Sequence, residues 1–181
     1  PSGHTVDLWS MAISNDPSYT NFGDMTQNGE AYDNYFYLGE DKTTYHSVEY
    51  REDIYVGYRY YETVAADMNK NKKGSGDTWY ENNVVYPFGH GLSYTTFDWE
   101  LCEDIAPTGK ITAPDNEITV KVKVTNTGEV TGKDVVQLYA TQPYTKGGIE
   151  KAERVLVTYG KTGLLKPGYS ETVTLKFAAQ D

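Results

Sequence analysis

The sequence predicts a mainly β protein, in which a long and mostly irregular segment, residues 1–106, precedes an antiparallel β-sandwich, residues 107–181. Short runs of alternating apolar and polar residues occur in the second region and hardly at all in the first. The first region holds 6 Lys and Arg against 18 Asp and Glu, giving −12, and the second holds 10 against 8, giving +2. Thirteen of the 17 tyrosines and all three tryptophans also lie in the first region. The two regions are therefore built differently.

Four segments of the second region predict strands. From Ile118 to Val124 every second residue is apolar, which is the period of a strand that buries one face, and turn residues follow at Thr125–Gly128. The other expected strands are 134–140, 154–159 and 172–177, with a turn at 165–168 before the last. An immunoglobulin-like sandwich has about seven strands in about 100 residues. We therefore expect an incomplete sandwich of the immunoglobulin or fibronectin type III-like kind, whose missing strands follow Asp181.

The composition of the first region predicts a long irregular segment that takes its structure from packing against a neighbouring domain. Glycine, asparagine, aspartate and tyrosine are scattered through it, and only Ile54–Tyr61 has the alternation of a strand. The stretch Asn69–Gly76 is rich in lysine, asparagine and glycine and predicts a mobile loop. Long irregular stretches are uncommon inside compact domains. Because aromatic rings bury large areas while their polar tips stay wet, the tyrosines suit packing along an adjacent domain.

Composition excludes several classes of function. No apolar run approaches the roughly 18 residues of a membrane span, so we expect a soluble protein without a membrane partner. Cys102 is the only cysteine, which excludes an intrachain disulfide and a cysteine-clustered zinc site. The three histidines lack metal-ligand spacing, and we expect neither a metal nor a cofactor. The acidic first region would repel phosphate backbones, so nucleic acid is not an expected partner. The cellular compartment stays open.

Several motifs follow one another in a specific order. Residues 1–7 read PSGHTVD, residues 50–62 read YREDIYVGYRYYE, and residues 86–95 read YPFGHGLSYT. VTNTG at 124–128 and LLKPG at 164–168 follow them. Together they resemble the C-terminal part of the β-glucosidase-like enzymes of glycoside hydrolase family 3. The resemblance implies the end of an α/β sandwich domain and a linker in residues 1–106, and a truncated fibronectin type III-like domain in 107–181. His4 departs from the arginine usual in the first motif.

The resemblance implies chemistry that this chain does not itself carry. Family 3 enzymes are retaining glycosidases, which use two carboxyl groups about 5–5.5 Å apart. The family's nucleophile lies in its barrel and its acid/base residue before the first motif, so we expect no catalytic residue here. The acidic pairs Glu40–Asp41, Glu52–Asp53 and Glu103–Asp104 are expected to be solvated surface. The implied partners are the catalytic domains of the same enzyme and a β-glucoside or oligosaccharide substrate. Glucoside, xyloside and N-acetylglucosaminide remain open as substrates, as does the domain order.

Aromatic residues around the two longest motifs are the candidate contact residues. Glycines at 89 and 91 permit a tight turn that holds the neighbouring rings in defined positions. Candidates for contact with a sugar are Trp79, Tyr80, Phe88 and Tyr94, and candidates for packing between domains are Tyr58, Arg59 and Tyr60. Simple packing or anchoring is the alternative for the first four.

Two functions are consistent with these patterns. The first is a noncatalytic portion of a retaining β-glucosidase, which organises the catalytic domains and contributes to the substrate cleft. The second is a carbohydrate- or protein-binding fibronectin-like module whose tyrosine-rich arm grips its ligand.

Overall fold

A computed structural model describes residues 4–19, 51–102 and 117–178, together with the backbone of four short strands between residues 26 and 46. These strands form two antiparallel pairs, β2 (Thr26–Gln27) with β3 (Glu30–Ala31) and β4 (Tyr35–Tyr37) with β5 (Thr44–His46). The chain divides into two compact units. We call residues 1–5, 90–143 and 154–181 the sandwich unit, and residues 6–89 and 144–153 the helix unit.

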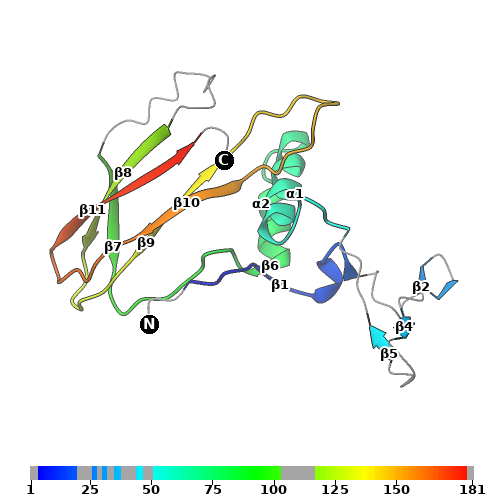
Figure 1. The fold of residues 1–181 in the computed structure, drawn as a ribbon, viewed down its shortest axis with the longest axis horizontal. Helices are drawn as coiled ribbons and strands as arrows, with labels where there is room; N and C mark the ends of the chain where they lie inside the picture. Colours follow the sequence, from blue (N-terminus) through cyan, green and yellow to red (C-terminus); the bar gives the residue numbers. More distant parts are fainter. Residues whose placement is uncertain are drawn as a thin grey trace. The chain divides into compact units, whose positions relative to one another are not determined.

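Two antiparallel sheets form the sandwich unit (Figure 1). One sheet has the strand order β11-β8-β7 and the other pairs β10 with β9. The bounds are β7 (Phe97–Leu101), β8 (Glu117–Asn126), β9 (Val135–Ala140), β10 (Val155–Lys161) and β11 (Ser170–Ala178). The four strands expected from the sequence are confirmed, and so is the mainly β class. Strand β7 was not expected, although its sequence FDWEL alternates apolar and charged residues.

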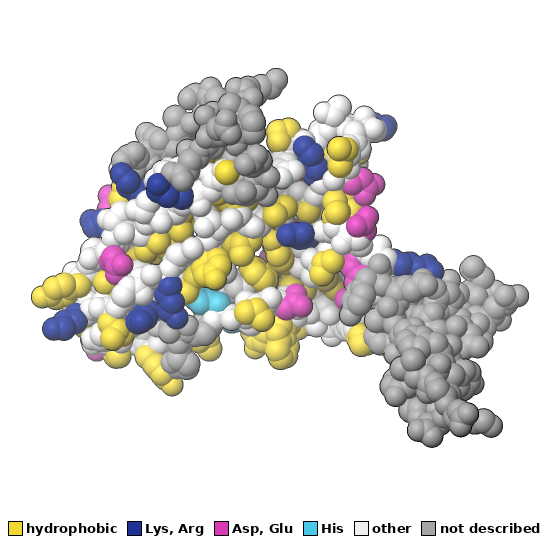
Figure 2. Space-filling view, viewed as in Figure 1, with side chains coloured by type: hydrophobic (Ala, Val, Ile, Leu, Met, Phe, Trp, Pro, Cys, Tyr) yellow, Lys and Arg dark blue, Asp and Glu magenta, His cyan; other side chains and the backbone are white. Residues whose placement is uncertain are grey.

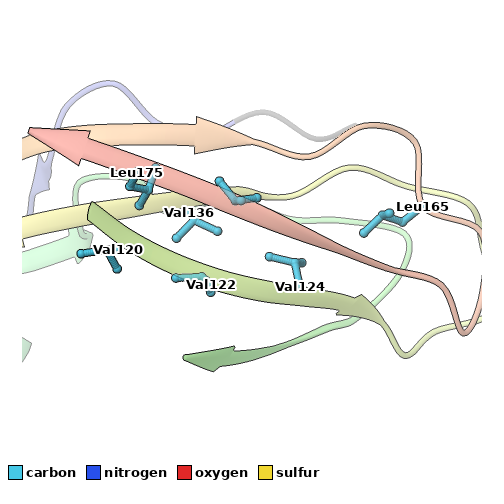
Figure 3. Packing of buried hydrophobic residues seen from close by; sticks show 7 residues of the cluster. Val120, Val122, Val124, Val136, Leu165 and Leu175 are labelled. Carbon is cyan, nitrogen blue, oxygen red and sulfur yellow. The ribbon is translucent and has the colours of Figure 1, made fainter. Parts of the chain in front are cut away.

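The core of this unit lies between its two sheets. Val120, Val122 and Val124 of β8 are buried, and the lysines between them are exposed. On the neighbouring strand, Val173 and Leu175 are buried and pair with Val122 and Val120. Val136 of β9 and Leu165 from a loop complete the cluster. Figure 3 shows these side chains gathered between the strands, so the period of two read in the sequence is the period of burial.

Gly160 marks a very close approach within this core. It lies in β10, and a Cβ atom at this position would be 2.5 Å from Val173 Cγ1 and 2.9 Å from Leu175 Cδ2. Real Cβ atoms do not approach other carbons so closely. The two sheets are therefore packed at a separation that only glycine permits here.

The helix unit contains the elements that the sequence analysis missed. Helix α1 covers Tyr58–Asn71 and α2 covers Ser75–Asn83, and they are preceded by the strand β1 (Trp9–Ser10) and followed by β6 (Val84–Tyr86). The strand predicted at Ile54–Tyr61 is wrong. A turn at residues 53–54 precedes Gly57, which has φ of 58°, and helical spacing begins after it, with Tyr61 and Ala65 both buried one turn apart.

The loop predicted at Asn69–Gly76 is confirmed only at residues 72–74, which join the two helices, because the residues on either side of them are helical. The Asn69 side chain accepts a hydrogen bond from the Gly76 backbone N–H at 2.8 Å and donates one to Asp77 at 2.8 Å. Gly76 is buried, and a Cβ there would lie 1.8 Å from the Ala65 backbone oxygen. The helices therefore cross in backbone contact, and the asparagine and glycine that predicted a loop instead hold the hairpin together.

Residues 144–153 follow β9 in sequence but pack on α1. The Glu153 backbone N–H donates to Thr63 Oγ1 at 3.0 Å, and the Glu153 carboxylate pairs with Lys70 at 3.3 Å. Lys70 also pairs with Asp67, which is the main reason that its pKa is raised. Ala152 is buried. This connection therefore belongs to the helix unit.

The domain boundary predicted between residues 106 and 107 lies outside the described residues and stays a prediction. Strand β7 precedes it and nevertheless pairs with β8 along five residues, with Trp99 opposite Val124. The Trp99 indole N–H donates to Asp134 at 2.7 Å, which ties β7 to the residues that lead into β9.

Candidate binding surfaces

An aromatic cluster joins the two helices of the helix unit. The rings of Tyr61 and Trp79 stack with centroids 5.8 Å apart, and Tyr60 meets Trp79 edge-on at 6.5 Å. Tyr61 is buried, and this burial raises the pKa of its hydroxyl. Trp79 and Tyr80 are half-buried. Of the residues singled out in the sequence, Tyr60 and Trp79 are therefore brought into direct contact, at the junction of α1 with α2.

A second aromatic contact joins the start of α1 to the turn after β6. Tyr58 and Phe88 have ring centroids 4.5 Å apart, and both are half-buried. Gly89, with φ of 78°, allows the chain to turn directly after Phe88. Two candidates that lie 30 positions apart in the sequence are thus in contact, and Arg59, the next residue after Tyr58, is half-buried as well.

The ribbon formed by β1 and β6 exposes apolar side chains that sequence reasoning did not single out. Trp9 pairs with Tyr86, their rings meeting edge-on at 6.2 Å, and the Met11 N–H donates to the Asn83 oxygen at 2.8 Å. We call the exposed apolar residues of this region the ribbon surface: Trp9, Met11, Ile13, Val85 and Tyr86. Yellow apolar side chains reach the molecular surface at many points of the face drawn in Figure 2. Several exposed large apolar side chains in one region are typical of interaction sites.

Glu52 departs from the expectation that the acidic pairs are solvated. Its carboxylate is buried and accepts a hydrogen bond from the Ser18 hydroxyl, which is also buried and in turn accepts one from the Arg51 N–H at 3.0 Å. The expectation of solvation is therefore wrong for Glu52. Its neighbour Asp53 is exposed, with φ of 48°. The other two acidic pairs lie outside the described residues.

Tyr94 lies in the sandwich unit, where it lines a cleft of about 420 Å³. Tyr94 is 77% exposed, and Leu164, which also lines this cleft, is 69% exposed. Two lysines, Lys133 and Lys161, also line this cleft. The turn predicted as one candidate site, Phe88–Tyr94, therefore spans both units, and its two aromatic residues are parts of different structures.

Asn126 holds three segments of the cleft wall together. This residue is completely buried, and its side-chain amide donates to the backbone oxygens of Val130 and Leu165, both at 2.8 Å. Its side-chain oxygen accepts from Thr95 Oγ1 at 2.6 Å and from the Gly128 N–H at 3.1 Å. All four hydrogen-bonding positions of the amide are filled. The asparagine of the VTNTG motif is thus a structural centre, although the sequence indicated only a turn.

Metal-binding and membrane-spanning features are not found in the described part of the chain. Within it, no three His, Cys, Asp or Glu side chains gather closely enough to hold a metal ion. His4 pairs with Gly91 through the backbone. None of the described helices combines the length and apolar character that a membrane crossing requires.

Comparison with known proteins first gives the class of the sandwich unit. Residues 134–181 match the family profile of the fibronectin type III-like domain, which agrees with the two packed antiparallel sheets of this region.

Relatives of the chain are β-glucosidases. It is 34% identical over 174 residues to the thermostable β-glucosidase B of Acetivibrio thermocellus, covering 96% of this chain and 18% of the relative. It is 41% identical to β-glucosidase A of Butyrivibrio fibrisolvens over 145 residues, 15% of that protein. The chain thus spans less than a fifth of these relatives.

The solved structures that resemble this chain are also β-glucosidases. A β-glucosidase of Paenibacillus barengoltzii is 35% identical with a TM-score of 0.67, and the match covers 98% of this chain and 15% of that one. β-Glucosidase 3B of Thermotoga neapolitana, solved in complex with α-D-glucose, is 32% identical with a TM-score of 0.62, covering 98% and 19%. Together these matches support the identification of the chain as a C-terminal fragment of a glycoside hydrolase family 3 protein.

Proposed function

We propose that this chain is the noncatalytic portion of a retaining β-glucosidase that hydrolyses terminal β-D-glucosyl residues, in which it organises the catalytic domains. One observation carries the proposal. The ribbon surface exposes Trp9 at 60% and Ile13 at 65%, on a chain that spans only 15% and 18% of two relatives named as β-glucosidases. Burying a large apolar side chain contributes about 1.5–3 kcal/mol. The ribbon surface is therefore suited to pack against the rest of such an enzyme.

The proposal assigns no catalytic carboxylate to this chain. A retaining glycosidase needs one carboxyl group as nucleophile and another as acid and then base, about 5–5.5 Å apart on either side of the bond that is cleaved. The buried carboxylate of Glu52 is bonded to Ser18 among residues of its own unit, and we assign it to the packing of that unit. The chain by itself is then inactive.

The aromatic candidates divide into two roles under this proposal. Tyr58, Arg59 and Tyr60, which are each half-buried, pack between domains. Trp79, Tyr80, Phe88 and Tyr94 are the candidates for contact with the substrate. The ring contacts of Trp79 with Tyr60 and of Phe88 with Tyr58 favour packing for these two, whereas the high exposure of Tyr94 leaves its ring available to a ligand.

A chimera tests the proposal. This chain replaces the corresponding segment of β-glucosidase A of Butyrivibrio fibrisolvens, and hydrolysis of an aryl β-glucoside and the Tm are measured. We expect hydrolysis by the chimera and none by the 181-residue chain. Trp9→Ala should lower the Tm of the chimera more than that of the chain by itself. Tyr159→Ala, which removes an exposed ring of the sandwich unit, is the matched control.

Three results would overturn the proposal. The first is hydrolysis by the chain alone that is abolished by Glu52→Gln. The second is an equal effect of Trp9→Ala on chimera and chain, because the ribbon surface would then pack against nothing further. The third is saturable quenching of the tryptophan fluorescence of the chain by a soluble neutral β-glucan, which would favour the binding-module function.

A further inference from the structure

The cleft of the sandwich unit combines positive charge with an exposed apolar wall. Residues from three segments line it: 93–95, 130–133, and 161 with 164. Its volume of about 420 Å³ lies within the range of about 300–1,000 Å³ that is usual for small-molecule sites. Lys133 and Lys161 are its charged lining residues, and no carboxylate side chain lines it.

The carboxylates nearest in sequence to these lysines are engaged elsewhere or lie outside the cleft. Asp134 accepts hydrogen bonds from the Trp99 indole at 2.7 Å and from the Val135 N–H at 2.9 Å. Glu171 accepts from the Gly163 N–H at 2.8 Å. Glu129 is exposed and does not line the cleft. Among the side chains that line the cleft, two are positively charged and none is negatively charged, which favours an anionic ligand.

The apolar wall suits a flat ring. Tyr94 is 77% exposed and Leu164 is 69% exposed, and Val130 is also exposed beside them. An aromatic ring with one free face can stack on the C–H face of a pyranose. A bare inorganic anion gains nothing from such a wall, whereas a sugar ring that carries a carboxylate uses the wall and the lysines together.

We propose that this cleft binds a uronic acid residue of an oligosaccharide, with the pyranose ring on Tyr94 and the carboxylate at Lys133 and Lys161. The Asn126 hydrogen bonds hold Thr95, Val130 and Leu165 in place, so the walls are formed before a ligand arrives. The site goes beyond the proposed function, since it concerns an acidic sugar at the sandwich unit. It does not depend on that function, because binding is measured on the chain by itself.

Titration of the ¹⁵N-labelled 181-residue chain tests this site, with amide shifts of residues 93–95 and 130–133 as the readout. The probes are cellobiouronic acid, neutral cellobiose and inorganic phosphate. We expect saturable shifts with cellobiouronic acid, weaker binding of the other two, and a fall in affinity when the ionic strength rises from about 0.02 to about 0.5 M. Lys133→Met and Lys161→Met should each lower the affinity by about two- to fivefold, as for exposed ion pairs.

Two further variants separate binding from folding. Tyr94→Ala should lower the affinity for cellobiouronic acid while the amide spectrum away from the cleft is unchanged. Lys123→Met removes the same charge from β8, where the lysine pairs with Glu100 at 3.2 Å, and should leave the affinity unchanged. Because all three lysines are on the protein surface or half-buried, their variants carry the test even where Tyr94→Ala perturbs the fold.

Four outcomes would overturn the inference. They are the absence of saturable shifts at millimolar cellobiouronic acid, equal binding of cellobiose, equal binding of inorganic phosphate, and an equal effect of the Lys123 variant and the cleft lysine variants. Equal cellobiose binding would mean that the lysines do not select the ligand. Equal binding of inorganic phosphate would mean that the apolar wall does not contribute to selecting the ligand.

Discussion

Replacement of Asn126 tests the claim that one buried amide holds the loops of the sandwich unit together. In Asn126→Ala the Val130 oxygen and the Thr95 hydroxyl lose their bonds to the amide. The Leu165 oxygen and the Gly128 N–H lose theirs as well, but keep the Gly132 N–H and the Thr96 oxygen as partners. The backbone of residue 126 keeps its own bonds, which run from its N–H to the Tyr169 oxygen and from the Gly168 N–H to its oxygen. The substitution therefore removes the side-chain network and leaves the strand pairing intact.

The size of the effect follows from four lost hydrogen bonds at a buried site. Each contributes about 1 kcal/mol net, and buried groups left without a partner cost more, so Asn126→Ala should lower the free energy of unfolding by about 3–5 kcal/mol. Asn126→Asp should be worse near neutral pH, because a carboxylate oxygen then faces two backbone oxygens. Protonation at acidic pH restores one donor, so the difference between Asp and Ala should narrow as the pH falls.

Urea unfolding followed by the fluorescence of Trp99 measures this effect. The reference chain carries Trp9→Phe and Trp79→Phe, which leaves Trp99 of β7 as the one tryptophan, so the signal reports the sandwich unit. Thr127→Ala, at the neighbouring exposed position, is the control and should change stability by less than about 0.5 kcal/mol. A loss below about 1 kcal/mol for Asn126→Ala, or an Asp variant more stable than the Ala variant at neutral pH, would refute the reasoning.

Three further predictions concern packing and pH. Gly160→Ala should lower the free energy of unfolding of the sandwich unit by about 1–3 kcal/mol, because the new methyl group would lie 2.5 Å from Val173 Cγ1. Urea unfolding measures this loss. An unchanged midpoint would mean that the two sheets can move apart with no loss of stability. Gly76→Ala should reduce the helical circular dichroism signal and the Tm, because its Cβ would lie 1.8 Å from the Ala65 oxygen; full retention of both would disprove that the helices cross in contact. Burial raises the pKa of Tyr61 above 10.0, so its contribution to stability is complete below pH 10 and is lost as the pH rises through the folded-state pKa. Tyr61→Phe should therefore show a smaller alkaline loss of Tm, and an identical pH profile would contradict this assignment.

Local periodicity alone determined the strands of the sandwich unit. Along β8 and β11 apolar residues recur at every second position. The spacing of Val120, Val122 and Val124 therefore shows in the sequence which face of β8 becomes buried. The motifs likewise predicted the family, since they are short contiguous strings. Helix α1 carried a local signal as well, in the spacing of Tyr61 and Ala65 after Gly57, but the alternation from Ile54 to Tyr60 competes with it.

Tertiary structure decided everything that depends on residues distant in the chain. Asn126 reads as a turn residue until Thr95 and Leu165, which lie 31 and 39 positions away, are brought to its side chain. The cleft around Tyr94 exists only where three separate segments meet, and neither its charge nor its apolar wall has a contiguous pattern. Sequence order records the period of one element, whereas contacts between elements depend on how the sheets pack. The strands were therefore predictable, and the amide network and the cleft were not.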